Sequence, residues 1–305
     1  MALSSAGRHI LRIARLQSCS AAAVRSVHGF NDVEIKEMKE KFSAFPGGSI
    51  DLVKEDKSGI AVMTLNNPGR VNAFSGTMML ELEERVAELE GWTKGKGLIV
   101  KGAGQNFCSG NDLNKIKAMI DPQDGMKVCM FMQNALTRLN RLPLISVALV
   151  EGKALGGGAE LTVACDFRLM APGSVIQFMH KFIGLVPGWG GAARLVHIVG
   201  RQTALKLLAS AKAVDPDYGM HIGLADGLVN STDAAGALAE AGQWLARYTK
   251  VPAPVNRAVK QVVVSGSDLP LEDALKAEKD VFGTVWGAPA NLAALYAKMY
   301  GQGHR

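Results

Sequence analysis

Short apolar runs alternate with amphipathic stretches through most of this 305-residue chain. The apolar runs have the length and composition of buried β-strands, and they lie at residues 60–65, 98–100, 145–150 and 167–170. Residues 75–89 instead repeat apolar side chains at helical spacing, with Ser75 placed to cap the first turn. Residues 126–142 form a second helical stretch, which Pro143 ends. Strands that alternate with helices predict an α/β fold with crossover connections.

The pattern changes towards both ends of the chain. Residues 31–48 indicate a short helical lead-in that ends at a Pro-Gly-Gly turn. After about residue 252, strand-like runs give way to helical ones, at residues 255–264, 271–285 and 290–300. Residues 265–267 (Ser-Gly-Ser) and 287–289 (Gly-Ala-Pro) are expected to separate these helices, because glycine and proline disfavour a helix interior.

Two glycine-rich segments each follow an apolar run and lead into helical sequence. They read FCSGNDL at residues 107–113 and GKALGGGAE at residues 152–160. Glycine between a strand and a helix lets the backbone turn tightly and leaves its N–H groups uncovered. One such turn is more often purely structural. Two of them brought together could aim two N–H groups at one oxygen, which is the arrangement of an oxyanion hole.

The pair of segments resembles the crotonase superfamily, the group of enoyl-CoA hydratases and isomerases. Further runs agree with that resemblance in order and spacing: LNNP at 65–68, NAF at 72–74, CDFR at 165–168 and GLVPGWGG at 184–191. The resemblance implies an α/β spiral of ββα units, with a C-terminal helical region that covers the acyl pocket and supports a homotrimer or hexamer. The expected parts are an N-terminal extension at residues 1–48, a crotonase-like core at 49–251 and the helical region at 252–305.

The resemblance also implies which groups form the hole. The N–H groups of Ser109 and Gly157 are expected to bind the thioester oxygen of an acyl-CoA substrate. Gly157 would also stand at a helix N-terminus, where the helix dipole favours an anion. Such a hole suits any thioester reaction that passes through an enolate. Coenzyme A is then part of the substrate, and neither a further cofactor nor a metal is expected.

The acid and base groups beside the hole distinguish members of the superfamily. Hydratases place one glutamate just after the glycine triplet, and Glu160 matches it, although a carboxylate there could equally serve only the helix dipole. They place a second glutamate four residues before the glycine that is Gly184 here, and that position holds His180. The row QFMHKF at residues 177–182 contains no carboxylate. Both hydration by two glutamates and isomerisation by a carboxylate base are therefore disfavoured.

Loss of CO2 from a malonyl-type thioester needs no base, only a stabilised enolate and a proton donor. A neutral or protonated His180 could tolerate or hold the substrate carboxylate that a glutamate would repel, although a lone histidine is as often merely packed. Trp189 could strip water from that carboxylate, or could simply pack the turn. Three more runs narrow the resemblance to a decarboxylase of the superfamily that serves metabolite repair: FPGGSIDL at 45–52, MFMQN at 130–134 and GTVWGAPANL at 283–292.

Charge and composition bear on the partners. The net charge of +6 and the pI of about 9.1 suit a polyanionic coenzyme A. Since no Lys/Arg block stands out and aromatic residues make up 6%, nucleic acid is not expected as a partner. No apolar stretch approaches the length of a membrane span. The residues expected to contact CoA are Asn72, Ala73, Asp112, Leu113, Lys115 and Lys298.

Two rival functions stay open. The chain could be an enoyl-CoA hydratase or isomerase that uses Glu160 alone, or a non-catalytic member that binds RNA or protein. Location is also open, because residues 1–30 contain four arginines and no acid, which is typical of a mitochondrial transit peptide. The family resemblance favours the cytosol, which we expect. Cys108 and Cys165 lie in apolar contexts without disulfide or C-x-x-C spacing, which predicts packed thiols in a reducing compartment.

Overall fold

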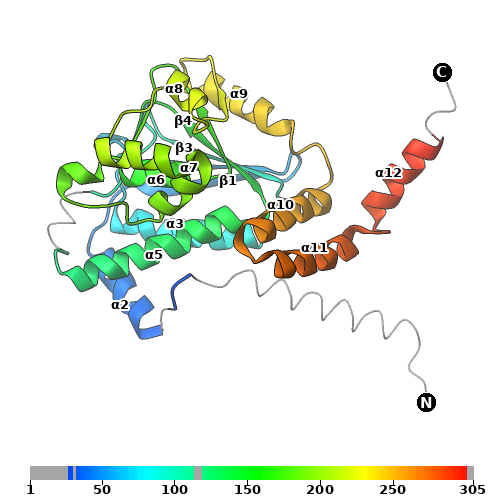
Figure 1. Cartoon of the computed structure of the whole chain (residues 1–305), viewed down its shortest axis with the longest axis horizontal. Coiled ribbons are helices and arrows are strands. Elements are labelled where there is room, and N and C mark those ends of the chain that lie inside the picture. Colours follow the sequence, from blue (N-terminus) through cyan, green and yellow to red (C-terminus); the bar gives the residue numbers. More distant parts are fainter. Residues whose placement is uncertain (1–26, 30–31, 113–118, 301–305) are drawn as a thin grey trace.

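A computed structural model describes residues 27–29, 32–112 and 119–300 (Figure 1). Its centre is a six-stranded sheet in the order β1-β2-β3-β4-β6-β8. The strands are β1 (Ser49–Glu55), β2 (Ile60–Asn66), β3 (Gly97–Gly102), β4 (Ile145–Val150), β6 (Phe167–Met170) and β8 (Gly227–Leu228). Only β1 pairs antiparallel to its neighbour in this sheet. Two short parallel strands, β5 (Lys153–Leu155) and β7 (Val175–Gln177), form a second sheet. The predicted α/β class is confirmed.

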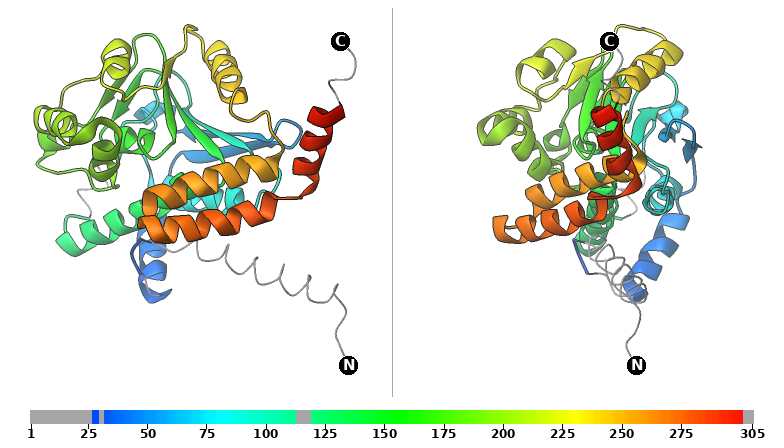
Figure 2. Two further views of the ribbon diagram at one scale, coloured as in Figure 1. Left: turned by 45° about the vertical axis from the view of Figure 1, so that its right-hand side comes forward. Right: turned by 90° about the vertical axis from the view of Figure 1, so that its right-hand side faces the viewer.

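Helices surround the large sheet. They are α2 (Asp32–Ser43), α3 (Gly76–Glu90), α5 (Pro122–Arg141), α6 (Gly157–Thr162), α7 (Gly191–Ser210), α8 (Pro216–His221) and α9 (Ala234–Ala246), with 3-10 turns η2 (Pro68–Arg70) and η3 (His180–Ile183). The C-terminal helices are α10 (Ala253–Asp268), α11 (Leu271–Val285) and α12 (Pro289–Tyr300). Helices α10 and α11 run side by side, and α12 stands away from the sheet (Figures 1 and 2).

Both faces of the sheet are buried, and β4 shows how. Successive strand residues point to opposite faces. Ala148 and Val150 belong to the core that includes α3 and α5, whereas Val147 and Leu149 pack in a second core with Leu245 of α9. The continuous apolar run of this strand, read from the sequence as buried, therefore reflects cover on both sides.

Helix ends largely follow their sequence signals. The Ser75 hydroxyl accepts a hydrogen bond from the Met78 N–H at 2.9 Å and so caps α3, as predicted. Helix α5 ends at Arg141, before Pro143, also as predicted. It begins earlier than expected, at Pro122, because Asp121 caps it.

The predicted break at residues 265–267 is wrong, because α10 continues to Asp268. Tertiary contacts hold the helix: the Arg141 Nε donates to the Asp268 carboxylate at 2.7 Å, and Lys260 forms a buried ion pair with Asp166. These contacts outweigh the cost of about 1 kcal/mol that glycine imposes on a helix interior. The second predicted break is confirmed, since α11 ends at Val285 and α12 starts at Pro289.

The described residues include no helix long and apolar enough to cross a membrane. Over the same residues, no group of three or more His, Cys, Asp or Glu side chains is arranged to hold a metal ion. The division of the chain at residues 48 and 251 stays a prediction, although α10–α12 do account for most of the expected helical region.

Candidate active site

Both glycine turns open onto one cavity of about 980 Å³. Its lining is mainly apolar, with Phe45, Met79, Leu155 and Val186 among the side chains. This size and composition are those of small-molecule sites, which combine apolar walls with a few placed polar groups. The polar groups come largely from the two turns and from the segment that follows β7.

The first turn does not use Ser109 as predicted. The Ser109 N–H donates to the Val71 carbonyl oxygen at 2.9 Å. Its hydroxyl donates to the Arg70 carbonyl at 3.2 Å. A backbone N–H that already holds another loop cannot also donate in line to a substrate oxygen. The assignment of Ser109 as an oxyanion donor is therefore wrong.

The next residues show which N–H is open. The Gly110 N–H donates to the Cys108 sulfur at 3.3 Å, and the Asp112 N–H donates to the Phe74 carbonyl at 3.3 Å. Asn111 lies between them, and its N–H has no acceptor within the described part of the chain. Asn111 also lines the cavity. It takes the place of the predicted donor Ser109, two residues further along the chain.

The second turn leaves the predicted N–H open. The Gly156 N–H donates to the Gln177 carbonyl at 2.9 Å. Gly157 is the first residue of α6, where helix geometry provides no acceptor, and none of the described residues supplies one. An ideal Cβ on Gly110 would lie 2.7 Å from the Gly157 nitrogen, so the two turns touch. The N–H groups of Asn111 and Gly157 thus lie at the same cavity wall.

Glu160 is buried, with 1% of its surface exposed, and both of its carboxylate oxygens are occupied. Oε1 accepts from the His180 Nε2–H at 2.9 Å and from the Gly188 N–H at 3.2 Å. Oε2 accepts from the N–H groups of Trp189 and Gly191, each at 2.8 Å. Glu160 therefore positions the loop after η3 and has no open face for the water that a hydratase activates.

His180 begins η3 and lines the cavity. Its side chain is 11% exposed. Because the Glu160 carboxylate only accepts, the proton of that hydrogen bond belongs to Nε2. The other ring nitrogen, Nδ1, is buried and has no hydrogen-bond partner among the described residues. An ideal Cβ on Gly156 would lie 3.9 Å from the Nε2 atom, so the ring lies beside the second turn.

Trp189 packs the second turn, which is one of its two expected roles. It is 3% exposed and packs edge to face on Phe74, with ring centroids 5.3 Å apart. Its ring carbons would approach an ideal Cβ on Gly157 to 2.9 Å, so any side chain at that position has to displace the ring. The ring packs the turn and also forms the cavity wall next to the Gly157 N–H.

The expected CoA contacts divide into two groups. Ala73 and Asp112 line the cavity, and Asp112 pairs at 2.9 Å with Arg70, a cavity residue that sequence reasoning missed although it precedes the NAF run. Asn72 is completely buried, and its amide donates to the carbonyls of Ala103 and Asn106. The side chain of Asn72 therefore holds loops together and is not available to CoA, which corrects that prediction.

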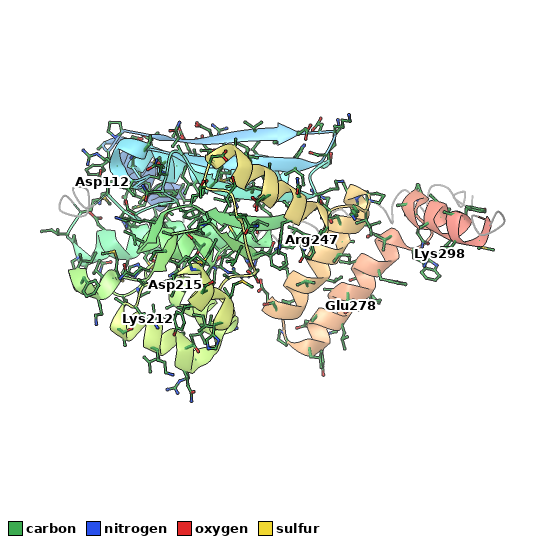
Figure 3. The ribbon with its side chains drawn as sticks, turned by 90° about the horizontal axis from the view of Figure 1, so that it is seen from above. Asp112, Lys212, Asp215, Arg247, Glu278 and Lys298 are labelled. Atoms are coloured by element: carbon green, nitrogen blue, oxygen red, sulfur yellow. The ribbon has the colours of Figure 1, made fainter. Side chains whose placement is uncertain are left out.

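The remaining expected CoA contacts do not reach the cavity or cannot be placed. Lys298 lies on α12, at the opposite end of the molecule from Asp112 (Figure 3), so it does not serve the cavity of its own chain. Leu113 and Lys115 lie outside the described residues.

The cysteines behave as packed thiols. Cys108 and Cys165 are buried and free, and burial raises the pKa of each to about 12. Cys129, which lines the cavity, donates to the Gly188 carbonyl at 2.7 Å. Burial, and then the charge of Glu160, raises its pKa as well. These thiols are mostly protonated near neutral pH, which confirms the prediction for the first two.

Comparison with known proteins agrees with this geometry. The profile of the enoyl-CoA hydratase/isomerase family matches residues 55–288. The chain belongs to this family. It is similar to the ethylmalonyl-CoA decarboxylase of Gallus gallus, with 63% identity over 268 residues, which cover 88% of this chain and 90% of the relative. The protein of the same name from Homo sapiens is 56% identical over 271 residues, covering 89% and 87% of the two chains.

Solved structures of the family share the fold. An enoyl-CoA hydratase from Polaromonas sp. JS666 superposes with a TM-score of 0.72 at 25% identity, covering 83% of this chain and 97% of that one. A Thermobifida fusca YX protein solved in complex with CoA gives a TM-score of 0.68 at 25% identity, with 84% and 97% covered. The predicted crotonase-like architecture is confirmed.

Proposed function

We propose that this protein decarboxylates ethylmalonyl-CoA to butyryl-CoA, with methylmalonyl-CoA as a lesser substrate that gives propionyl-CoA. The observation that carries the proposal is the high identity to vertebrate ethylmalonyl-CoA decarboxylases over most of both chains. The site supports the same activity. Two backbone N–H groups of the oxyanion hole are open, while the buried carboxylate of Glu160 already accepts four hydrogen bonds. The protein is thus a carboxy-lyase acting on acyl-CoA thioesters.

The reaction passes through a thioester enolate. The N–H groups of Asn111 and Gly157 donate to the thioester oxygen, on which negative charge develops as the bond from C2 to the carboxylate breaks. Removal of one donor of this kind costs about 2.7–4 kcal/mol in other enzymes. Trp189 and the apolar lining keep water from the carboxylate, which favours departure as uncharged CO2.

The rest of the acyl-CoA lies towards the cavity rim. Arg70 has a half-exposed side chain and pairs with Asp112, so it offers a cation to the CoA phosphates at little desolvation cost. The chemistry uses the enolate of the substrate itself and requires no biotin, metal or nucleotide. The protein acts in metabolite repair by removing a side product of acyl-CoA carboxylation.

The protein assembles as a homotrimer or hexamer through its C-terminal helices. Large apolar side chains on α10, on α11 and directly after α11 are exposed in the single chain, including Val263 at 63%, Leu271 at 74%, Phe282 at 56% and Trp286 at 71%. Apolar surface of this extent is typical of a protein interface. Light scattering of the purified protein tests the oligomeric state, and a monomer would contradict it.

The protein acts in the cytosol, with the mitochondrial matrix as the alternative. The proposal rests on the family resemblance, against the arginine-containing, acid-free composition of residues 1–30. Fusing these residues to a reporter tests it directly. Import into mitochondria followed by cleavage would show that the protein is a matrix enzyme.

Release of CO2 from a panel of malonyl-type CoA thioesters tests the activity. We expect the highest turnover with ethylmalonyl-CoA, less with methylmalonyl-CoA, and no effect of EDTA or avidin. Conversion of crotonyl-CoA without CO2 release would instead identify a hydratase or isomerase. Salt-dependent RNA binding without acyl-CoA turnover would identify a non-catalytic member.

A further inference from the structure

Decarboxylation leaves an enolate whose C2 must receive a proton, and the cavity contains few groups able to supply it. Among the described residues, the titratable side chains that line it are Arg70, Asp112, Asp121, Cys129, Glu160 and His180. Arg70 and Asp112 form an ion pair, and Asp121 caps α5 through the Gln123 N–H. The Cys129 thiol donates to a backbone carbonyl, and Glu160 holds four donors.

Resting on the proposed decarboxylation, we infer that His180 is the catalytic acid and delivers the proton to C2 from Nδ1. This nitrogen is buried and has no hydrogen-bond partner among the described residues, and it belongs to a side chain that lines the cavity. A buried polar group left unpaired costs about 1–3 kcal/mol, so its place in the fold points to a ligand. In the complex, the substrate carboxylate is the hydrogen-bond partner of Nδ1, and after CO2 leaves, C2 accepts the Nδ1 proton.

Glu160 is the positioning residue for this step. Its carboxylate fixes the proton on Nε2, at 2.9 Å, and thereby leaves Nδ1 as the nitrogen that gains and loses the second proton.

Other charged groups beside η3 are directed elsewhere. The Lys181 ammonium, adjacent to His180, donates to the Ala209 carbonyl at 2.6 Å. The Arg194 guanidinium of α7 donates to the Trp189 carbonyl at 2.8 Å and to the Thr137 hydroxyl at 2.9 Å. Neither group is therefore placed as the proton donor for C2.

Decarboxylation and the proton transfer to C2 conserve atoms and charge. The bond from C2 to the carboxylate carbon breaks, CO2 leaves, and the electron pair forms the enolate held by Asn111 and Gly157. The Nδ1–H bond of the His180 imidazolium then breaks, its proton forms the new C2–H bond, and the negative charge returns from the oxygen. His180 is left neutral and takes up a proton from solvent before the next turnover. One proton is consumed for each CO2 released.

The configuration of deuterium at C2 tests this assignment. The full-length protein is supplied with ethylmalonyl-CoA in D2O, and the butyryl-CoA formed is analysed for its configuration at C2. A positioned donor adds deuterium to one face of the enolate, so the wild type should give a single configuration. In H180Q, water replaces the donor, and the product should be a near-equal mixture, with CO2 release reduced about 10²-fold or more. H221Q, a surface histidine change, is the matched control and should retain a single configuration.

Each outcome of this experiment supports or overturns the assignment of His180 as the acid. A racemic wild-type product, or an H180Q product of one configuration, would overturn the assignment. If H180Q releases no CO2, the folded variant His180→Gly is assayed with added imidazole. Recovery of CO2 release with a single configuration supports the assignment, and lack of recovery overturns it. Absence of CO2 release by the wild type would refute the proposed decarboxylation itself, which is a different outcome.

Discussion

The two glycine turns meet at one cavity but expose an N–H group by different means. In the second turn, Gly157 starts a helix, so its N–H is open for a reason that lies within the turn itself. In the first turn, the N–H groups of Ser109 and Asp112 donate to carbonyls of a segment distant in sequence and that of Gly110 donates to the Cys108 sulfur, which leaves the Asn111 N–H open. In the second turn, the open N–H group is determined by the turn's own helix start, whereas in the first turn it is determined by contacts with the fold around it.

This difference explains which open N–H group could be located from the motif. The position of Gly157 could be inferred from a triplet that opens a helix. The choice between Ser109 and Asn111 depended on the Val71 carbonyl, which reaches the turn from another loop. Motif spacing locates a turn, but the partners of each N–H decide which one can face a substrate.

The largest effect is expected from Gly157→Pro, which removes the N–H of the locally defined turn. Proline is tolerated at the first position of a helix, so α6 should still form. Loss of one oxyanion donor should lower kcat for ethylmalonyl-CoA about 10²–10³-fold. Steady-state kinetics measures this, with circular dichroism to verify the fold.

Gly157→Ala is the matched control, because it keeps the N–H and adds only a Cβ. That Cβ would lie 2.9 Å from the Trp189 ring, so some loss is expected through displacement of the ring. It should be clearly smaller than the loss in the proline variant. Equal rates for the folded proline variant and the wild type would show that Gly157 donates nothing to the enolate.

The next effect concerns the boundary between decarboxylase and hydratase. His180→Glu restores the second glutamate of the hydratases beside Glu160. A buried carboxylate there should repel the carboxylate of the substrate, and the imidazole acid is lost as well, so we expect kcat/KM for ethylmalonyl-CoA to fall about 10²-fold or more, with KM raised and kcat lowered. Some hydration of crotonyl-CoA is the corresponding gain. His180→Gln, which is neutral, should weaken substrate binding less; a folded glutamate variant with wild-type KM would mean that this residue does not face the substrate carboxylate.

Much of the fold could be predicted from local signals. Strand runs, the Ser75 cap and the Pro143 stop depend on neighbouring residues, and the structure confirms each of them. The helix break expected at residues 265–267 was wrong because contacts to distant residues, such as Arg141 with Asp268, hold α10 together. Weak local propensity yields to tertiary packing.

Individual residues of the site could be predicted from the sequence, but the contacts between them could not. Glu160 and His180 were identified separately, yet their hydrogen bond spans 20 residues of sequence and decides what each can do. Lys298 was expected to contact CoA, although α12 carries it away from its own cavity (Figure 3). Which residues lie close together depends on the topology of the fold, and the spacing of motifs along the sequence does not reveal it.

A smaller effect, on stability rather than on chemistry, is expected from Glu160→Gln. The amide NH2 cannot accept from the backbone N–H groups that the carboxylate binds, so two of its four bonds are lost. Each buried donor left unpaired costs about 1–3 kcal/mol, and Tm should fall by roughly 5 °C or more. Glu278→Gln, at an exposed position of α11 (Figure 3), is the control and should leave Tm unchanged. An unchanged Tm with complete loss of activity would favour a catalytic role for Glu160 instead.

The smallest effect is expected from Ser109→Ala, which tests whether the Ser109 hydroxyl contributes to the first turn or to the reaction. The Ser109 hydroxyl is exposed and donates only to the Arg70 carbonyl, while the backbone N–H that holds Val71 remains in the variant. Loss of one such hydrogen bond should lower stability by about 0.5–1.5 kcal/mol or less. Because the enolate is assigned to the Asn111 N–H, kcat should change less than about fivefold. Chemical denaturation and steady-state kinetics measure the two quantities. A loss of kcat as large as that of Gly157→Pro, in a protein of near wild-type stability, would mean that the Ser109 hydroxyl takes part in the reaction or in holding the first turn open.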